Sequence, residues 1–283
     1  MKPAVCAGPF VYTASGLLRG VRILCSSSSL ATTLLIANPA SAQTITEHIA
    51  TGDSLYDALQ PDAAAEQYRA ALFLNVGNYE ALWKLARAQI DVAKQLLGDE
   101  TEKERDRLYN DAWIYAAEAM RVDSLDAEGH FMLASVMGRL SRTKGGKERV
   151  RFGKEIYDEA ATALELDPQH DGAHHVIGAW HAEVKRLSGI TKFFAKTFLG
   201  GGYMGIASWD SAAVHLEKSV EIKPDYIFHR LELAEVYLDL DQHAAASEQL
   251  AQISLLPVSD VMDPIHKETA ARLLDEIEER NQI

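Results

Sequence analysis

The chain has 283 residues, of which 47% are hydrophobic, enough to bury the core of one large domain or two small ones. Its formal net charge of −13 repels phosphate backbones and argues against a nucleic-acid partner. The two cysteines, Cys6 and Cys25, both lie in the first 42 residues, a stretch that contains no acidic side chain. The composition therefore separates this N-terminal stretch from the rest of the chain.

Residues 1–42 have the pattern of a leader. Their few charges are basic, the short apolar run from Leu30 to Ala37 follows, and Ala40-Ser41-Ala42 places small residues where signal peptidase accepts them. We therefore expect cleavage after Ala42 and export to the periplasm or the medium. The apolar run is shorter than the ~20 residues that cross a bilayer. The alternative is an uncleaved N-terminus that anchors the chain in a membrane or forms a disordered tail.

Cleavage at this point would remove three positive charges and no negative ones, so the net charge would become −16. It would also remove both cysteines. A mature chain without cysteine has no disulfide, no thiolate metal site and no cysteine nucleophile. Several classes of enzyme are excluded on this basis.

From residue 45 onward a helical pattern recurs along the chain. A small residue, an aliphatic pair and a helix breaker follow one another at Ala71–Val76, Ala119–Ser124, Ala163–Pro168 and Ser219–Pro224. A large aliphatic residue and then a small one occur in the helix after each, at Leu85-Ala86, Leu133-Ala134, Ile177-Gly178 and Leu233-Ala234. The small residue lets two helices approach closely. These features match the 34-residue tetratricopeptide repeat.

The predicted fold is all-α: one tetratricopeptide solenoid over residues 43–283, with five helix pairs and a closing helix. The repeats are expected at about 45–78, 79–126, 127–170, 171–226 and 227–260, and the amphipathic capping helix at 263–281. The second, third and fourth repeats exceed the pattern by 14, 10 and 22 residues. All three inserts fall between the two helices of a repeat, so they lengthen helices or project from one edge.

The fourth repeat carries the most specific resemblance. His174–Val184, which contains Gly178-Ala-Trp180, the stretch Phe193–Gly201, and Pro224-Asp225-Tyr226 resemble the helical-repeat domain of the regulator of microtubule dynamics family. The resemblance covers roughly residues 45–280. It implies the tetratricopeptide fold. It also implies relatives that are membrane-anchored in animals, one of them associated with phospholipid binding and membrane tethering. Export would separate this chain from cytoplasmic microtubules.

Catalytic and metal-binding motifs receive little support. His174, His181 and Glu183 are the only candidates for a convergent polar or zinc-binding cluster. His130 occupies the same repeat position as His174, which indicates an architectural role instead. The stretch Gly200–Gly205 spells Gly-x-Gly-x-x-Gly but lacks the preceding strand that a dinucleotide site requires. We therefore expect no catalytic residue, no metal and no cofactor.

The expected functional surface is the groove lined by the first helix of each repeat. Its predicted lining is largely apolar and aromatic, and comprises Trp83, Arg87, Ile90, Phe131, His175, Leu231 and Leu238. The fourth insert is expected to border this groove with apolar side chains and a basic rim, formed by Lys192, Phe193, Phe194, Lys196 and Phe198. The alternative is that the insert folds back and fills the groove as core.

The sequence thus predicts a non-catalytic binding or scaffold protein. Its groove would take an amphipathic helix of a protein partner or a hydrophobic ligand, because an apolar trough with a basic rim suits either. The alternatives are a lipid-binding or lipid-transfer protein, with phospholipid as the ligand, and a microtubule-associated regulator, both implied by the resemblance. An enzyme is not expected, and neither is a nucleic-acid or metal partner.

Overall fold

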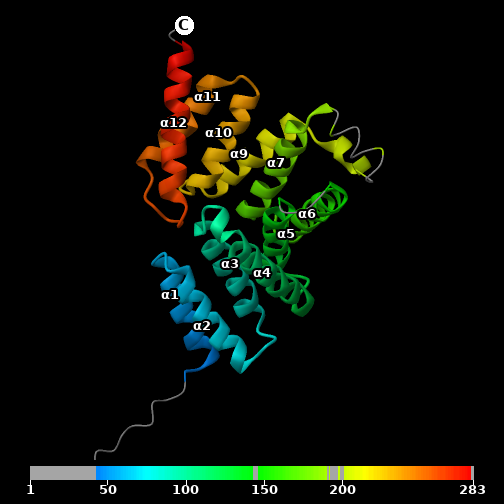
Figure 1. Ribbon diagram of the computed structural model, residues 1–283, viewed down its shortest axis with the longest axis vertical. Helices are drawn as coiled ribbons and strands as arrows, with labels where there is room; N and C mark the ends of the chain where they lie inside the picture. Colours follow the sequence, from blue (N-terminus) through cyan, green and yellow to red (C-terminus); the bar gives the residue numbers. More distant parts are fainter. Residues whose placement is uncertain (1–42, 143–145, 190, 192–196, 198–200, 282–283) are drawn as a thin grey trace, which may run out of the picture. The chain divides into compact units, whose positions relative to one another are not determined.

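The computed structural model describes residues 43–142, 146–189, 191, 197 and 201–281, drawn in colour in Figure 1. The predicted leader, 1–42, lies outside the described residues. The same is true of the predicted rim residues, Lys192, Phe193, Phe194, Lys196 and Phe198. The export of the chain and the role of this rim therefore stay predictions.

Every regular element in the described part of the chain is helical, which confirms the predicted fold class. The α-helices are α1 Ile45–Asp57, α2 Pro61–Leu74, α3 Tyr79–Gln95, α4 Glu102–Val122, α5 Ala127–Ser141, α6 Gly146–Leu166, α7 Asp171–Arg186, α9 Trp209–Ile222, α10 Ile227–Asp239, α11 His243–Leu255 and α12 Asp263–Asn281. Two short 3-10 helices, η1 Asp99–Thr101 and η2 Gly201–Ile206, lie within the inserts of the second and fourth repeats.

Helices that are neighbours in sequence pack as antiparallel pairs, and the pairs stack on one another (Figure 1). The five pairs are α1 with α2, α3 with α4, α5 with α6, α7 with α9, and α10 with α11. Helix α12 packs against α10 and α11 and closes the array. The inserts of the second and third repeats lengthen both helices of their pair, so α4 and α6 each reach 21 residues.

Side-chain caps explain where several first helices of the repeats begin. Thr44 and Glu47 form a capping box at the start of α1. Asn78 Oδ1 accepts a hydrogen bond from the backbone N–H of Ala81 at 2.8 Å at the start of α3. His170 takes this role at α7, where its Nδ1 accepts from the N–H of Ala173 at 3.1 Å. These caps satisfy backbone donors that the first turn of a helix leaves unpaired.

Small residues form the seams where helices meet. A Cβ atom added at Gly178 would lie 2.6 Å from Leu216 Cγ and 3.0 Å from the carbonyl oxygen of Ala212, so α7 and α9 are already in contact there. The same holds at Gly52, where an added Cβ would lie 2.5 Å from Cε1 of Tyr68. Ala112 in α4 is fully buried in the same way. The small residues of the repeat pattern thus set the distance between helices.

The described end of the fourth insert folds back onto the helices. The hydroxyl of Tyr203 in η2 donates a hydrogen bond to the carbonyl of Val150 in α6 at 2.5 Å. Met204 is buried, and the ring of Trp180 in α7 lies 5.9 Å from that of Tyr203. This part of the insert belongs to the largest hydrophobic cluster of the described residues, which spans α3 to α7.

Candidate functional site

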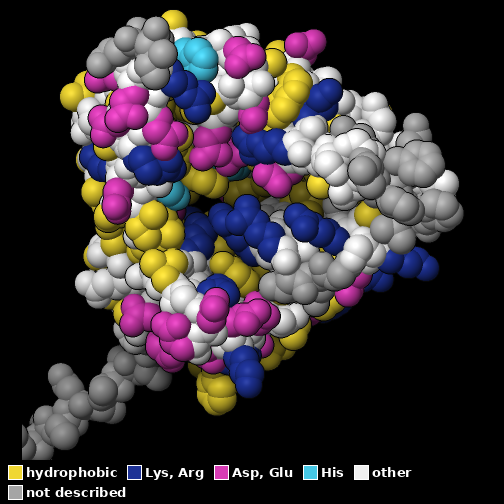
Figure 2. Space-filling model, turned by 45° about the horizontal axis from the view of Figure 1, so that its top comes forward, with side chains coloured by type: hydrophobic (Ala, Val, Ile, Leu, Met, Phe, Trp, Pro, Cys, Tyr) yellow, Lys and Arg dark blue, Asp and Glu magenta, His cyan; other side chains and the backbone are white. Residues whose placement is uncertain are grey.

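A cavity of about 980 Å³ lies among the first helices of the repeats, and its mouth is the hollow in the centre of Figure 2. Residues of α3, α5, α7 and α10 line it, together with the first half of α6 and parts of η2. Tyr56 of α1 and the segment Ser259-Asp260 before α12 close one end. The cavity therefore draws on every repeat and is the candidate functional site.

Four of the seven predicted groove residues line this cavity: Arg87, Ile90, Phe131 and His175. The other three do not belong to its lining. Leu231, only 4% exposed, is part of the cluster that α10 forms with Ala270 and Ile277 of α12, and Leu238 packs against the same cluster. The capping helix covers these two leucines, so their place in the groove was a wrong expectation. Trp83 packs between the two N-terminal hydrophobic clusters.

The expectation of a largely apolar and aromatic lining also needs correction. Among the described residues, seven Lys or Arg and eight Asp or Glu side chains line the cavity. Six of these fifteen occupy positions 13 and 16 of the second, third and fourth repeats: Asp91 and Lys94, Arg139 and Arg142, and Glu183 and Arg186. In the fifth repeat, which has no insert, the first helix ends at position 13, at Asp239. In the second, third and fourth repeats the first helix is longer and extends the groove face by about one turn. The residues at position 16 of this added turn are all basic.

One side of the cavity is cationic. Arg139 and Arg142 come from the end of α5, and Arg149 comes from the first turn of α6. None of the three has an ion-pair partner among the described residues. The guanidinium of Arg139 lies 6.0 Å from the centre of the Phe228 ring. Three unpaired arginines on a chain of net charge −13 form a distinct cationic surface, and Figure 2 shows Lys and Arg side chains along the hollow.

The opposite side is acidic. Arg186 of α7 contacts four carboxylates: its Nη2 lies 2.8 Å from Asp239 and 3.9 Å from Glu235, and its Nη1 lies 3.2 Å from Glu183 and 3.4 Å from Glu232. Burial, together with the neighbouring charge of Glu232, raises the pKa of Glu235 to about 7. Burial also raises the pKa of Glu232, although Arg186 opposes this. Four carboxylates share one guanidinium, so this side carries excess negative charge.

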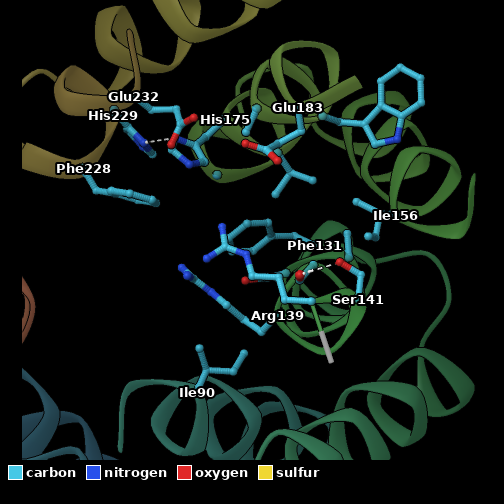
Figure 3. A pocket seen from close by; sticks show the side chains of 18 of the residues that line it. Ile90, Phe131, Arg139, Ser141, Ile156, His175, Glu183, Phe228, His229 and Glu232 are labelled. Carbon is cyan, nitrogen blue, oxygen red and sulfur yellow. Dashed lines mark hydrogen bonds between the residues drawn. The ribbon is translucent and has the colours of Figure 1, made fainter. Parts of the chain in front are cut away.

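Two histidines form a buried pair in the cavity wall, above Phe228 in Figure 3. The Nδ1 atoms of His175 and His229 lie 3.1 Å apart, and His229 Nε2 lies 2.9 Å from Asp171 Oδ2. If Nε2–H of His229 donates to Asp171, its Nδ1 accepts from Nδ1–H of His175. Burial lowers the pKa of His175 well below its ordinary value and also lowers the pKa of His229. Both imidazoles are therefore neutral at pH 7.

The predicted candidates for a polar or metal-binding cluster do not converge. His174 Nδ1 lies 3.0 Å from Nδ1 of His215, and its Nε2 donates to the carbonyl of Pro168 at 3.2 Å. His181 Nδ1 accepts instead from the backbone N–H of Ser208 at 3.3 Å. Glu183 lies beside Arg186 in the cavity. In the described ranges, no three His, Cys, Asp or Glu side chains are grouped so that they could hold a metal ion.

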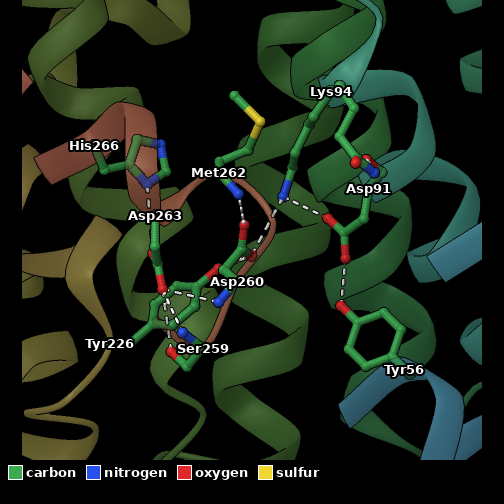
Figure 4. Close-up of polar contacts among 10 residues, drawn as sticks. Tyr56, Asp91, Lys94, Tyr226, Ser259, Asp260, Met262, Asp263 and His266 are labelled. Carbon is green, nitrogen blue, oxygen red and sulfur yellow. Dashed lines mark hydrogen bonds and ion pairs between the residues drawn. The ribbon is translucent and has the colours of Figure 1, made fainter. Parts of the chain in front are cut away.

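The closed end of the cavity is a polar network that joins the first two repeats to the last loop (Figure 4). Lys94 Nζ lies 2.6 Å from Asp91 and 3.9 Å from Asp260, and Asp91 also accepts a hydrogen bond from the hydroxyl of Tyr56. Asp260 in turn accepts from the hydroxyl of Tyr226 at 3.0 Å. Burial and the nearby carboxylates raise the pKa of both tyrosines, so they remain protonated donors.

No helix in the described part of the chain combines the length and the apolar character that a membrane span requires. The helix pairs, the small-residue seams and the cavity between the first helices together define a tetratricopeptide-type repeat protein. The chain belongs to the family described as regulator of microtubule dynamics protein 1-3, whose profile matches residues 48–278. This confirms the resemblance that the fourth repeat indicates.

Known relatives and a solved structure agree with this assignment. The chain is 25% identical to regulator of microtubule dynamics protein 1 of Bos taurus over 71% of its own length and 63% of that protein. It is 29% identical to protein 3 of the same species, over 62% of its own length and 36% of that protein. The chain thus spans less than two thirds of these relatives. The crystal structure of a thermophilic TPR protein from Thermus thermophilus has the same fold. It matches 81% of this chain and 99% of that chain with a TM-score of 0.59 at 20% identity.

Proposed function

We propose that the protein is a non-catalytic binding protein whose cavity holds an amphipathic helix of a protein partner. The observation that carries the proposal is the cavity itself, which combines about 980 Å³ of space with three arginines, Arg139, Arg142 and Arg149, that have no ion-pair partner in the described ranges. A helix about 10 Å across with a rise of 1.5 Å per residue fills about 120 Å³ per residue, so the cavity accommodates roughly two turns. Phe131, Ile90 and Ile156 provide apolar contacts for such a helix (Figure 3).

A lipid is the competing ligand, and the composition of the lining argues against it. An acyl chain gives no hydrogen bond to Arg139, Arg142 or Arg149, which have no ion-pair partner among the described residues, and covering such groups without a partner is unfavourable. A peptide offers backbone and side-chain groups that can pair with them. A microtubule-directed role has support only from the names of the relatives.

Gly138 allows a direct test. It lines the cavity, and a Cβ atom added to it would meet no atom within 4 Å, so Gly138→Phe should fill the cavity without disturbing the fold. Gly205→Phe is the matched control, because Gly205 has the same open surroundings and does not belong to the lining. Both variants should show the circular dichroism spectrum of the wild type.

The probe is a library of helical peptides with leucines fixed at i, i+3, i+4 and i+7 and other positions varied. Peptides selected on the wild type should bind Gly138→Phe at least tenfold more weakly and bind Gly205→Phe equally well. Equal binding to Gly138→Phe, or no selection at all, would contradict the proposal. Native mass spectrometry that finds co-purified lipid on the wild type and not on Gly138→Phe would replace it with the lipid alternative. Co-sedimentation with microtubules that Gly138→Phe does not affect would favour the role that the relatives' names imply.

We also propose that the chain is exported, on the basis of the leader pattern in residues 1–42. Intact-mass measurement after full-length expression in a host with a secretion pathway should give a mature protein that begins at Gln43. A mass that includes residues 1–42 would contradict cleavage after Ala42.

A further inference from the structure

Two groups of like charge line the cavity, although Glu128 at the start of α5 and Arg186 at the end of α7 depart from this division. The cationic flank consists of Arg139, Arg142 and Arg149, which belong to α5 and α6 or adjoin them. The acidic flank consists of Glu183, Glu232 and Glu235, which belong to α7 and α10 and surround Arg186. The two flanks therefore come from different repeats, and each has a surplus of one sign.

The two flanks face each other across the cavity. In Figure 3, Arg139 and Phe131 lie on one side, and Glu183 and Glu232 lie on the other. None of the three arginines is within ion-pair distance of a carboxylate in the described part of the chain, although Glu232 and Glu235 line the same cavity. The flanks are held apart, and the space between them is free for a ligand.

Apolar side chains line the same cavity, namely Phe131, Ile156, Val184 and Met204 of η2. A ligand that fills this space thus meets positive charge on one side, negative charge on the other side and apolar side chains of the same wall. Arg139 is half-buried, whereas Arg142 and Arg149 are exposed, so water screens the charges of these two more strongly.

We propose that the partner is a charge-split amphipathic helix, with Asp or Glu along the flank that meets the arginines and Lys or Arg along the other flank. This inference rests on the proposed function and adds the chemistry of the partner. A helix presents three such rows because residues at i, i+3, i+4 and i+7 share one face. The division of charge also fixes the direction in which the helix lies, since the reverse orientation brings like charges together.

A ligand of a single sign does not match this arrangement. An anionic lipid or an acidic peptide would pair with Arg139, Arg142 and Arg149 but would leave the excess carboxylates around Arg186 without a counter-charge. A basic peptide would leave the arginines unpaired. Electrostatic complementarity on both sides of the cavity therefore favours the charge-split helix.

The experiment uses the same leucine-fixed peptide library, with the flanking positions varied, and three variants of the full chain. The cationic-flank variant is Arg139→Gln, Arg142→Gln and Arg149→Gln. Its matched control is Arg107→Gln, Arg121→Gln and Arg151→Gln, which removes the same charge from exposed ion pairs outside the cavity. The acidic-flank variant is Glu232→Gln with Glu235→Gln, and Glu235→Gln alone serves if the double variant does not fold.

Peptides selected on the wild type should carry acidic residues on one flank and basic residues on the other. The cationic-flank variant should bind them at least tenfold more weakly and lose selection for acidic residues only, whereas the acidic-flank variant should lose selection for basic residues only. The control should bind as the wild type does, and added salt should weaken wild-type binding.

Three results would overturn the inference. If the selected peptides bind Gly138→Phe more weakly than the wild type but show no preference for charged residues, the charge-split partner is refuted and the proposed function stays intact. Selection for one sign of charge only would also refute it. A third result would refute both this inference and the proposed function. In that case the wild type binds vesicles of anionic lipid and the cationic-flank variant does not, while the selected peptides bind Gly138→Phe as tightly as the wild type.

Discussion

The seams between helices and the wall of the cavity are built from opposite kinds of side chain. At the seams, Ala and Gly alternate with residues such as Leu216, which is fully buried and lies against Gly178. In the wall, long charged residues such as Arg139 and Glu235 project from the same helices. The seams follow from the repeat pattern and stabilise the fold, whereas we expect exposed charged residues of the wall, such as Arg149, to change with little effect on stability. This difference makes the two regions separable by mutation.

The largest effect is expected from Leu216→Ala in α9. This change removes a fully buried side chain and leaves a cavity beside Gly178, which destabilises a protein by about 3–5 kcal/mol. Urea denaturation should show the loss. Val214→Ala on the same helix is the control, because Val214 is 61% exposed and its truncation should change the free energy of unfolding by less than about 0.5 kcal/mol. Equal losses for both variants would refute the assignment of α9 to a seam.

Gly178→Ala should destabilise the protein by about 1–3 kcal/mol, because the new Cβ collides with Leu216 and the backbone of Ala212. Gly138→Ala in the cavity wall should be neutral or stabilise α5 by up to about 1 kcal/mol, since alanine favours a helix and meets no atom there. Thermal unfolding of the two variants measures the contrast directly. If Gly138→Ala were as destabilising as Gly178→Ala, the wall would be as tightly packed as the seam.

Acid should weaken the protein through its buried histidines. Burial lowers the pKa of His175, and it lowers that of His215 to about 4, with the charge of His174 adding to the effect. A histidine with a lowered pKa binds its proton more readily in the unfolded chain, so its stabilising effect is complete above about pH 6.5 and falls as the pH drops toward 4. Urea midpoints measured across this window should fall, and His215→Gln should make the fall shallower. A slope unchanged by this variant would contradict the assigned pKa.

Glu235 should act in the opposite direction, with a smaller effect. Its raised pKa, about 7, means that the folded protein binds this proton more readily than the unfolded chain does, so stability is lost as the pH rises from about 4.5 through 7. Glu235→Gln should therefore stabilise the protein modestly at pH 8 and have little effect at pH 4. A gain that is equal at both pH values would show that burial does not hold the proton on Glu235.

The smallest effect is expected from Arg149→Gln. Arg149 is exposed and has no ion-pair partner in the described ranges, so its removal should change the free energy of unfolding by no more than about 0.5 kcal/mol. Chemical denaturation checks this value. A larger loss would show that the cationic flank supports the fold as well as the cavity.

The seams were predictable from sequence because each depends on local spacing that repeats along the chain. Ile177-Gly178 and Leu233-Ala234 show this directly, since each pair lies within the first helix of its repeat, α7 and α10. The wall was predictable only in part. Phe131 and His175 follow from repeat position, but Lys94 and Arg142, at position 16, lie beyond the point where the first helix of the regular fifth repeat ends.

Other features of the site depend on contacts between distant parts of the chain. The repeat pattern places Leu231 in the groove, but helix α12 packs over it, and nothing in the repeat specifies where a capping helix lies. The surplus of carboxylates around Arg186 likewise depends on two neighbouring repeats, because Glu183 comes from α7 and Glu232 from α10. A pattern read one repeat at a time does not reveal such a pairing.

The ion pair between Lys94 and Asp260 changes how the array should respond to loss of an end. In a repeat array whose units contact only their neighbours, terminal units fray independently. Here the loop before α12 contacts α3, because Asp260 lies close to Lys94. Forming this contact closes the long segment of chain between the two residues. We therefore expect the second repeat and the loop before α12 to lose structure in a more concerted way than the ends of an array without such a contact.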